Sequence, residues 1–238
     1  MSLKYRHEYK YLVSAGQLAV LENRLEGLVS RDAHAGSTGA YEIRSVYFDD
    51  YRDSCFHQNE AGEDPRAKFR IRIYNAEDAR ISLEKKSKKN GMTHKEQAAL
   101  TREQTEKLLS GEGLSIAEEA LKEYPPLLQQ FAVLYQMKRL RPKVIVNYER
   151  VPFVCKQGNV RITFDRNISS SDRFDLFFEK ELPQYPILPA GEHVLEVKFD
   201  EFLPSYIRQQ LETGHLRQTS FSKYYLCRKY GTGAMRVR

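Results

Sequence analysis

The stretch KFRIRIY at residues 68–74 alternates cationic and apolar side chains with a period of two. The alternation separates two sets of residues: Lys68, Arg70 and Arg72 against Phe69, Ile71 and Ile73. Successive side chains of a β-strand point to opposite faces, so the stretch predicts a strand whose apolar face packs on a core. The cationic face needs a different partner.

Strand character is present in eight segments, at residues 5–13, 41–49, 67–74, 80–86, 92–98, 143–153, 159–165 and 194–200. Asn90-Gly91 between two of them predicts a tight hairpin turn. Leucines at helical spacing and capping sequences at Ser14, Thr101–Gln104 and Ser115–Glu118 predict helices over 15–29, 102–110 and 116–138. Two more helices are expected within 204–230. With no linker or internal repeat, we predict one α+β domain over residues 1–238.

The composition narrows the class of partner. The 238 residues carry a formal net charge of +6, with a pI near 9.1, which favours nucleic acid, a membrane surface or a phosphorylated small molecule. Three widely spaced cysteines indicate a reducing compartment. The charged N-terminus lacks the apolar run of a signal peptide, and no segment approaches the roughly 18 apolar residues of a membrane span. We therefore expect a cytoplasmic protein with no stable membrane insertion.

Charge on one strand face recurs in four other strands: Arg6, Glu8 and Lys10; Arg80, Ser82, Glu84 and Lys86; Arg161, Thr163 and Asp165; Glu196, Lys198 and Asp200. A solvated sheet face explains any one of these strands alone. Two like charges about 6 Å apart, however, repel by nearly 3 kcal/mol at an effective dielectric of about 20, so gathered arginines call for an anion. If helices cover the apolar faces outside a closed barrel, the charged faces point inward, and about eight strands can enclose a ligand.

Arginine forks match phosphate oxygens in a bidentate manner, and lysine adds point charge. Three carboxylates stand among these cations: Glu8, Glu84 and Glu196. Mg²⁺ or Mn²⁺ typically uses one or two carboxylates plus substrate phosphates, so the residues predict a polyphosphate with a bound divalent metal. An internal salt bridge is the alternative for each carboxylate.

Seven segments also occur in an order typical of one family: Glu8-x-Lys10, SVYFDD at 45–50, FRIRIY at 69–74, SLEKKSKKNG at 82–91, NVRITFDRNI at 159–168, VLEVKFD at 194–200 and SFSKYY at 220–225. Over nearly its whole length the chain resembles the VTC domain, the polyphosphate polymerase domain of the vacuolar transporter chaperone complex. This domain is a branch of the triphosphate tunnel metalloenzymes, within the CYTH-like superfamily. The resemblance implies an α+β fold with an eight-stranded antiparallel β-barrel tunnel, helices packed outside, and manganese as the favoured metal.

The resemblance also implies roles by position. The candidate catalytic cations are Lys10, Arg70, Arg72, Lys86, Arg150, Arg161 and Lys223. The candidate substrate-binding residues are Lys95, Tyr148, Lys198 and Ser222. Glu196 resembles the metal-binding glutamate, with Glu8 and Glu84 as further metal candidates. Lys86 is preferred to Lys85 because the period of two places it on the face of Glu84.

The chain also departs from relatives of the family. Hydrolytic CYTH-type triphosphatases usually begin with Glu-x-Glu-x-Lys, whereas the first of these positions is Arg6 here, which favours transfer over hydrolysis. Ser220 stands where a second lysine can stand, so the handling of the acceptor stays open. No phosphate-sensing SPX domain or membrane anchor is found, so coupling to translocation is not expected, and no membrane or export partner is identified.

We therefore expect transfer of the ATP γ-phosphoryl to phosphate or a polyphosphate end, because a cage of cations with one Mn²⁺ or Mg²⁺ supplies the positioning and charge neutralisation that this reaction needs. The alternatives are a triphosphatase acting on tripolyphosphate or nucleoside triphosphates, and a noncatalytic polyphosphate-binding module. A nucleic-acid partner is disfavoured, because the cations lie on strand faces opposite apolar stripes rather than in an outer stripe with aromatic platforms. The chain length of the product, the primer, the metal used in the cell and the oligomeric state are left open.

Overall fold

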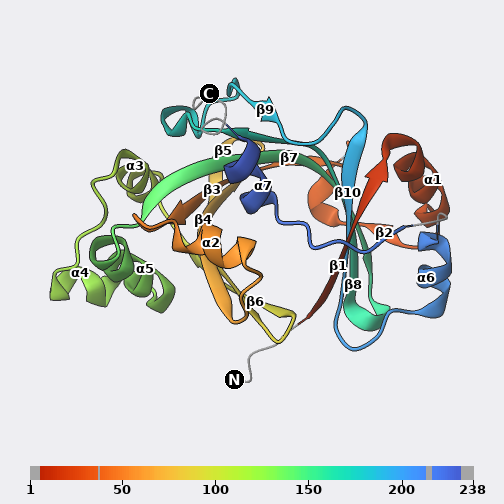
Figure 1. Cartoon of the computed structure of the whole chain (residues 1–238), viewed down its shortest axis with the longest axis horizontal. Helices are drawn as coiled ribbons and strands as arrows, with labels where there is room; N and C mark the ends of the chain where they lie inside the picture. The colour runs from red at the N-terminus through yellow and green to blue at the C-terminus, as the bar shows by residue number, and fades with distance from the viewer. Residues whose placement is uncertain (1–5, 37, 213–215, 232–238) are drawn as a thin grey trace. The chain divides into compact units, whose positions relative to one another are not determined.

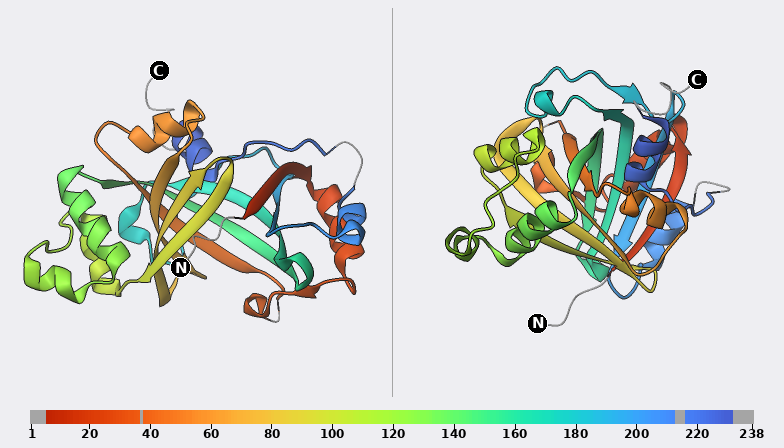
Figure 2. Two further views of the ribbon diagram at one scale, coloured as in Figure 1. Left: turned by 90° about the horizontal axis from the view of Figure 1, so that it is seen from below. Right: turned by 60° about the vertical axis from the view of Figure 1, so that its left-hand side comes forward.

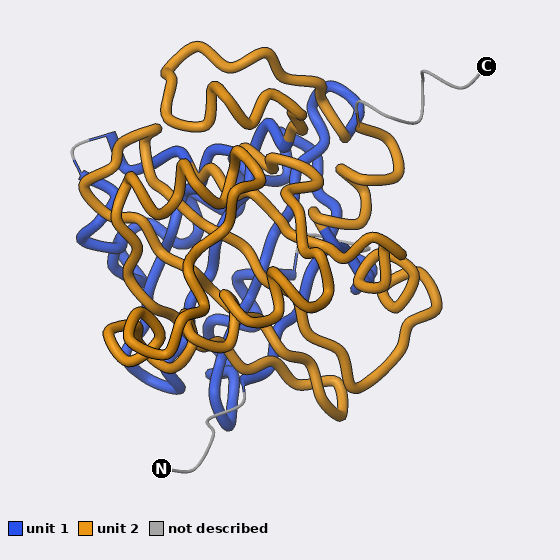
Figure 3. Tube along the Cα trace, turned by 90° about the vertical axis from the view of Figure 1, so that its left-hand side faces the viewer, with its two compact units in different colours: residues 1–42, 148–168, 188–222 blue, residues 43–147, 169–187, 223–238 orange. Residues whose placement is uncertain are grey.

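The computed structural model describes residues 6–36, 38–212 and 216–231. It forms two compact units, each assembled from three segments of the chain (Figure 3). Unit 1 comprises Met1–Glu42, Tyr148–Ile168 and Leu188–Ser222, and unit 2 comprises Ile43–Asn147, Ser169–Ile187 and Lys223–Arg238. The single domain over residues 1–238 stays a prediction.

Ten strands form an antiparallel sheet, labelled in Figure 1. They are β1 (His7–Ser14), β2 (Ser30–Arg31), β3 (Tyr41–Asp49), β4 (Arg66–Tyr74), β5 (Glu77–Lys89), β6 (Met92–Ala99), β7 (Arg141–Cys155), β8 (Val160–Ser171), β9 (Tyr185–Pro186) and β10 (Glu192–Phe199). Eight follow the order β1-β10-β8-β7-β3-β4-β5-β6, while β2 pairs with β7 and β9 pairs with β8. All eight predicted strands are confirmed, because the alternating pattern that predicted them is a property of each strand by itself.

The predicted hairpin is also confirmed. β5 and β6 meet at Asn90 and Gly91, which both have positive φ, as this tight turn requires. The Asp64 carboxylate accepts hydrogen bonds from the backbone N–H groups of Asn90 (2.9 Å) and Gly91 (2.8 Å). The turn is therefore held to the segment that leads into β4.

The helices are α1 (Ala15–Leu25), α2 (Ser54–Glu60), α3 (Arg102–Ser110), α4 (Glu118–Glu123), α5 (Pro126–Met137), α6 (Ser205–Leu211) and α7 (Lys223–Tyr230), with 3-10 turns η1 (Ala33–Ala35), η2 (Gln157–Asn159) and η3 (Phe174–Leu176) (Figures 1 and 2). Capping boxes begin α1 at Ser14 and α3 at Thr101, as predicted. Nowhere in the described ranges is a helix both long enough and apolar enough to span a bilayer.

Three helix predictions need correction. The helix expected over 116–138 is two helices, because Pro125 and Pro126 cannot continue α4, and Pro126 instead begins α5. Ser115 does not cap α4, whose N-cap is Ala117. The helix expected over 15–29 ends at Leu25, and α2 was not predicted.

Unit 1 buries one apolar cluster between its strands and the helices α1 and α6. The cluster consists of Val13, Leu18, Leu21, Leu25, Val151, Phe153, Val160, Ile162, Phe164, Leu195, Val197, Phe199 and Ile207. Alternate residues of β8 and β10 lie in this cluster, so the charged residues between them are directed to the opposite face. The predicted division of these strands into an apolar and a charged face is therefore confirmed.

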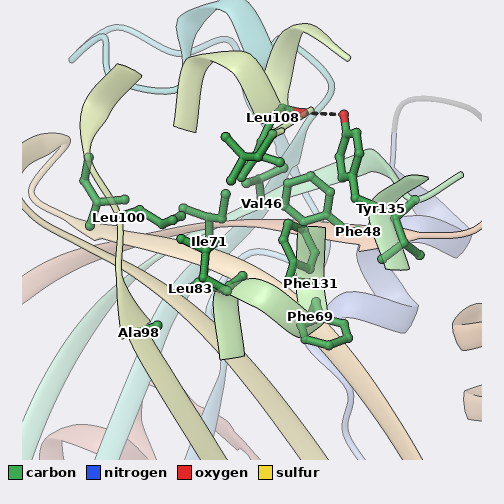
Figure 4. Close-up of a cluster of buried hydrophobic side chains, with 14 of the residues drawn as sticks. Val46, Phe48, Phe69, Ile71, Leu83, Ala98, Leu100, Leu108, Phe131 and Tyr135 are labelled. Atoms are coloured by element: carbon green, nitrogen blue, oxygen red, sulfur yellow. Dashed lines mark hydrogen bonds between the residues drawn. The ribbon is translucent and has the colours of Figure 1, made fainter. Parts of the chain in front are cut away.

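Unit 2 has its own core, in which the strands β3 to β6 pack against α3 and α5. Figure 4 shows Phe131 next to Phe48 and Phe69, and the Tyr135 hydroxyl donating a hydrogen bond to the Leu108 carbonyl (2.9 Å). Ile71 and Ile73 of the KFRIRIY stretch also lie in this cluster. The cations of that stretch are thereby directed away from the helices that cover the core.

Candidate active site

The polar face of unit 2 is built around one buried carboxylate. Glu84 on β5 is only 1% exposed; its Oε2 accepts from Arg70 Nε (2.7 Å) and its Oε1 from Lys95 Nζ (3.1 Å). Burial alone would raise the pKa of Glu84, but Arg70, Arg72 and Lys95 outweigh it and hold that pKa well below its usual range. Glu84 is therefore ionised and orients Arg70, which was predicted as a catalytic cation, and Lys95, which was predicted to bind substrate.

The paired arginines are also held by β3. Arg70 donates from Nη1 to the Tyr47 hydroxyl (2.8 Å), and Arg72 donates from Nε to the Ser45 hydroxyl (3.1 Å). Burial would raise the pKa of Tyr47, but the cations Arg70, Lys68 and Arg72 lower it to about 8. Tyr47 was missed in the sequence because a tyrosine in a strand is more often a core residue.

The register of β4, β5 and β6 places further cations on the same face as Arg70 and Arg72. We call the set Arg66, Lys68, Arg70, Arg72, Lys86, Lys88 and Lys95 the cationic face of unit 2. Lys86 lies opposite both Lys68 of β4 and Lys95 of β6, and Arg66 lies opposite Lys88. The structure thus places the predicted residues Arg70, Arg72, Lys86 and Lys95 on one face, together with Glu84.

The polar face of unit 1 has a different composition. We call Glu8, Lys10, Arg150, Asp165, Glu196 and Lys198 the mixed network of unit 1. Lys198 Nζ lies 3.0 Å from Glu196 Oε2 and 3.3 Å from Glu8 Oε1. Burial would lower the pKa of Lys198, but Glu196 and Glu8 outweigh it and raise that pKa, so Lys198 stays charged between them.

Lys10 and Arg150 complete the mixed network. Lys10 Nζ lies 3.8 Å from Glu196 Oε1 and donates a hydrogen bond to the Phe221 carbonyl (2.7 Å). Arg150 forms a bidentate pair with Asp165, at 2.7 and 2.8 Å, and its Nη2 is 3.6 Å from Glu196 Oε2. Asp165 was not among the predicted residues, although its place after Arg161 and Thr163 on one strand face was a usable signal.

Two other predicted residues of unit 1 lie outside this set of ion pairs. Arg161 donates from Nη2 to Asp32 (2.7 Å) and to the Tyr41 hydroxyl (3.1 Å). Tyr148 lies under the Arg150 guanidinium, whose carbon is 5.3 Å from the ring centroid, so it supports that arginine through a cation–π contact. Arg6 is paired with Asp200 (2.7 Å), so the first position of the hydrolytic motif carries a cation here.

Lys223 is the first residue of α7, directly after Ser222, and is buried. The same helix is fixed by Tyr224, whose hydroxyl donates to the fully buried Asp49 carboxylate (2.6 Å). Asp49 also accepts from the backbone N–H groups of Cys55 (2.9 Å) and Phe56 (3.0 Å) at the start of α2. This anchor was missed because its parts are far apart in the sequence.

Mn²⁺ and Mg²⁺ are hard cations that bind oxygen donors. Among the described residues there is no group of three or more His, Cys, Asp or Glu that could hold a metal by protein ligands alone. Glu8 and Glu196 nevertheless supply two hard oxygen donors on either side of Lys198. Since Mg²⁺ usually takes one or two carboxylates and completes its shell with water and substrate phosphate, this pair fits such a metal. Both oxygens of Glu84 accept hydrogen bonds from cations, at 2.7 and 3.1 Å, which is the salt-bridge alternative. The oxygens of Glu196 are also paired with cations, at 3.0 to 3.8 Å.

Structural comparison shows the fold. The "putative adenylyl cyclase HpAC1 from Hippeastrum", described as having a dominant triphosphatase activity, aligns at 13% identity over 94% of this chain and 95% of its own, with a TM-score of 0.57. A "putative adenylate cyclase" of Bacillus halodurans (16% identity, 89% and 88% coverage, TM-score 0.47) and the PH1012 protein of Pyrococcus horikoshii OT3 (12%, 87% and 85%, 0.43) are also similar. No curated protein gives a significant match.

Sequence comparison shows the family, because the VTC domain model matches residues 5–230. The match spans both units and includes all of the predicted site residues. The α+β fold of antiparallel strands covered by helices is the one expected for this family. The chain therefore belongs to the VTC domain family.

Proposed function

We propose that the protein is a metal-dependent phosphotransferase that makes inorganic polyphosphate from ATP. The observation that carries the proposal is the pair Arg70 and Arg72, held by Glu84, Tyr47 and Ser45 on a face with four lysines. Preorganised guanidinium forks suit phosphate oxygens, and they stabilise the charge on a transferring phosphoryl group without reorganising.

The reaction would be an in-line transfer without a protein nucleophile. The bond between the γ-phosphorus of ATP and its bridging oxygen breaks, a bond to a terminal oxygen of phosphate or polyphosphate forms, and ADP leaves. Positioning and charge neutralisation are the main requirements of such a transfer. The cations that would bind phosphate oxygens are Arg70, Arg72, Lys86, Lys10, Arg150 and Arg161. Supporting contacts would come from Lys95, Tyr148, Lys198 and Ser222. Lys223 would contribute from α7.

Glu196 and Glu8 would hold the metal. Mn²⁺ or Mg²⁺ bound there would supply positive charge to the phosphate oxygens. Lys10, Lys198 and Arg150 balance the charge of Glu196, since their ion pairs with it lie between 3.0 and 3.8 Å. We assign Glu84 to orienting Arg70 and Lys95, because its oxygens are engaged by these two cations.

A triphosphatase is the second candidate, because the similar Hippeastrum protein is described as having a dominant triphosphatase activity. One feature argues against this candidate. The first position of the Glu-x-Glu-x-Lys motif is Arg6, a cation paired with Asp200, instead of a carboxylate. A site with fewer carboxylates is less able to bind a second metal ion and to activate water for hydrolysis.

One assay decides between them. The purified protein is incubated with ATP and Mn²⁺ or Mg²⁺, and the products are resolved on a gel and assayed for free phosphate and ADP. Chains whose amount matches the ADP released support the proposal. Free phosphate without chains indicates the triphosphatase, and binding of polyphosphate without turnover indicates a noncatalytic module.

A further inference from the structure

One buried hydroxyl on the polar face of unit 1 has no hydrogen-bond partner in the part of the chain that the structure describes. It belongs to Thr163 of β8, a residue only 1% exposed. Its neighbours Ile162 and Phe164 lie in the apolar cluster of unit 1, so alternation directs the Thr163 side chain to the face of the mixed network. A buried polar group without a partner costs free energy, and it calls for a catalytic role or for a water or ion that it binds.

The strand register places Thr163 directly beside Glu196. On β10, Glu196 faces Thr163 on one side and Lys10 of β1 on the other. Facing residues on one side of a sheet have their Cβ atoms about 5 Å apart, so the hydroxyl and the carboxylate are neighbours. The oxygens of Glu196 are paired with Lys10, Lys198 and Arg150 instead. The hydroxyl therefore lies next to the carboxylate assigned to the metal without being bonded to it.

A structural role does not account for this hydroxyl. Thr105 of α3 is also fully buried, but its hydroxyl donates a hydrogen bond to the Thr101 carbonyl (2.9 Å) and so stabilises the first turn of the helix. Thr163 has no such bond. A valine would supply the same branched shape to the strand without an unpaired polar atom, so packing alone does not explain the hydroxyl of Thr163.

A threonine hydroxyl suits the shell of a hard divalent cation. Mg²⁺ prefers an octahedral shell of oxygens, and Mn²⁺ accepts a similar one. In P-loop NTPases a Ser or Thr hydroxyl binds the Mg²⁺ of the nucleotide. Such a hydroxyl offers a neutral oxygen to the cation, while its proton can be donated to a carboxylate or phosphate oxygen. It therefore adds a donor without adding negative charge.

We propose that Thr163 is the third oxygen donor of the divalent-metal site formed by Glu196 and Glu8, acting on the ion directly or through one water. The inference rests on the proposed function for the presence of the metal at Glu196, and it adds a residue from a third strand to the site. Two charged donors and one neutral donor leave the other positions of the shell to water and phosphate oxygens.

The test removes the hydroxyl and keeps the shape of the side chain. Thr163→Val replaces the hydroxyl with a methyl group, and Thr163→Ser retains the hydroxyl. Thr105→Val is the matched control, because it removes a buried hydroxyl that has a protein partner. The full chain is titrated with Mn²⁺ alone, without nucleotide or phosphate, and binding is followed as loss of the electron paramagnetic resonance signal of free Mn²⁺. Glu196→Gln gives the level expected for a lost metal ligand.

Thr163→Val should bind Mn²⁺ about 10-fold more weakly than the wild type, the scale typical of groups that support a metal ligand. Thr163→Ser should bind it nearly as the wild type does. In EDTA the Tm of Thr163→Val should equal or exceed that of the wild type, because no protein hydrogen bond is lost. The Tm of Thr105→Val should fall, while its Mn²⁺ affinity stays unchanged.

Three results would overturn the inference. Equal Mn²⁺ affinity of Thr163→Val and the wild type would exclude the hydroxyl from the metal site. A loss of Tm in EDTA as large as that of Thr105→Val would assign Thr163 a structural role. Weaker binding of metal-free tripolyphosphate, with unchanged Mn²⁺ affinity, would make it a phosphate contact. Failure of the proposed function is recognised separately, as a wild-type protein that binds Mn²⁺ but makes no chains from ATP.

Discussion

The polar faces of the two units are both formed by alternate residues of β-strands, but they carry different patterns of charge. In the mixed network of unit 1, three carboxylates alternate with three cations, and Lys198 lies between Glu8 and Glu196. The cationic face of unit 2 has seven cations, of which Arg70 and Lys95 form ion pairs with Glu84. Balanced charge can accept a divalent cation, whereas excess positive charge requires an anion. The proposed function assigns the metal to the first face and phosphate oxygens to the second, in keeping with this difference.

Replacing a carboxylate of the mixed network should have the largest effect on activity. We expect Glu196→Gln to reduce turnover at least about 100-fold, the scale typical of a lost electrostatic contact to the transition state. Affinity for tripolyphosphate without metal should not fall, because the network becomes more cationic. Rates and affinities are measured with Glu149→Gln as the control, since Glu149 is a more exposed carboxylate of the same unit. Unchanged turnover in Glu196→Gln would contradict the assignment.

Replacing the single carboxylate of the cationic face should mainly affect stability. Glu84→Gln leaves Arg70 and Lys95 without their anion, and breaking a buried pair costs about 3–5 kcal/mol. Denaturant unfolding measures this loss, and added tripolyphosphate should stabilise the variant more than the wild type. Glu96→Gln is the control, because Glu96 forms a partly exposed pair with Lys85 worth at most about 1 kcal/mol. Equal stability of Glu84→Gln and Glu96→Gln would show that the ion pairs of Glu84 with Arg70 and Lys95 do not stabilise the fold.

The anchor of α7 should give the next largest effect. Tyr224→Phe removes one hydrogen bond to the buried Asp49 carboxylate, and such a bond to a charged group contributes about 1.5–3 kcal/mol. If α7 positions Lys223, the rate constant of turnover should also fall while tripolyphosphate affinity changes little. Tyr225→Phe serves as the comparison, since its hydroxyl binds Glu60 at an exposed site. A Tyr224→Phe variant as stable and active as Tyr225→Phe would argue against the anchor.

The smallest effect concerns pH. The pKa of Tyr47 is lowered to about 8 from its ordinary value of 10, so the folded state favours the phenolate. The resulting stability is fully present above pH 10 and is lost as the pH falls through 8. The difference in unfolding free energy between the wild type and Tyr47→Phe should therefore rise by about 1.3 kcal/mol from pH 7 to pH 9. A pH-independent difference would show that the cationic face does not stabilise the phenolate.

Local patterns predicted much of the fold. The period of two in β4, β8 and β10 identified both the strands and the faces that carry charge, because alternation needs no knowledge of neighbouring segments. The same pattern placed Arg70, Arg72 and Lys86 together, since all three lie on antiparallel partners joined by short connections. Pro125 and Pro126 are a signal for a helix break, but apolar residues at helical spacing continue on both sides of them. The two helices were therefore predicted as one.

The ion pairs could not be predicted in this way. Arg150 on β7 forms an ion pair with Asp165 on β8, and the Tyr224 hydroxyl donates a hydrogen bond to Asp49, which is 175 positions away in the chain. A carboxylate within reach of several cations takes the partner that strand register and helix docking bring closest. The choice between a salt bridge and a metal ligand for Glu84 was therefore open in the sequence.

The sequence by itself determined which residues form strands, which faces are charged, and which family the motifs resemble, because each depends on spacing along the chain. The tertiary structure decided that Glu8 and Glu196 flank one lysine while Glu84 is held by Arg70 and Lys95. It also decided that the Lys68 ammonium lies close to the rings of both Tyr47 and Tyr224. The physical reason is that Coulomb and hydrogen-bond interactions act over a few ångströms in space, and only folding brings distant residues that close.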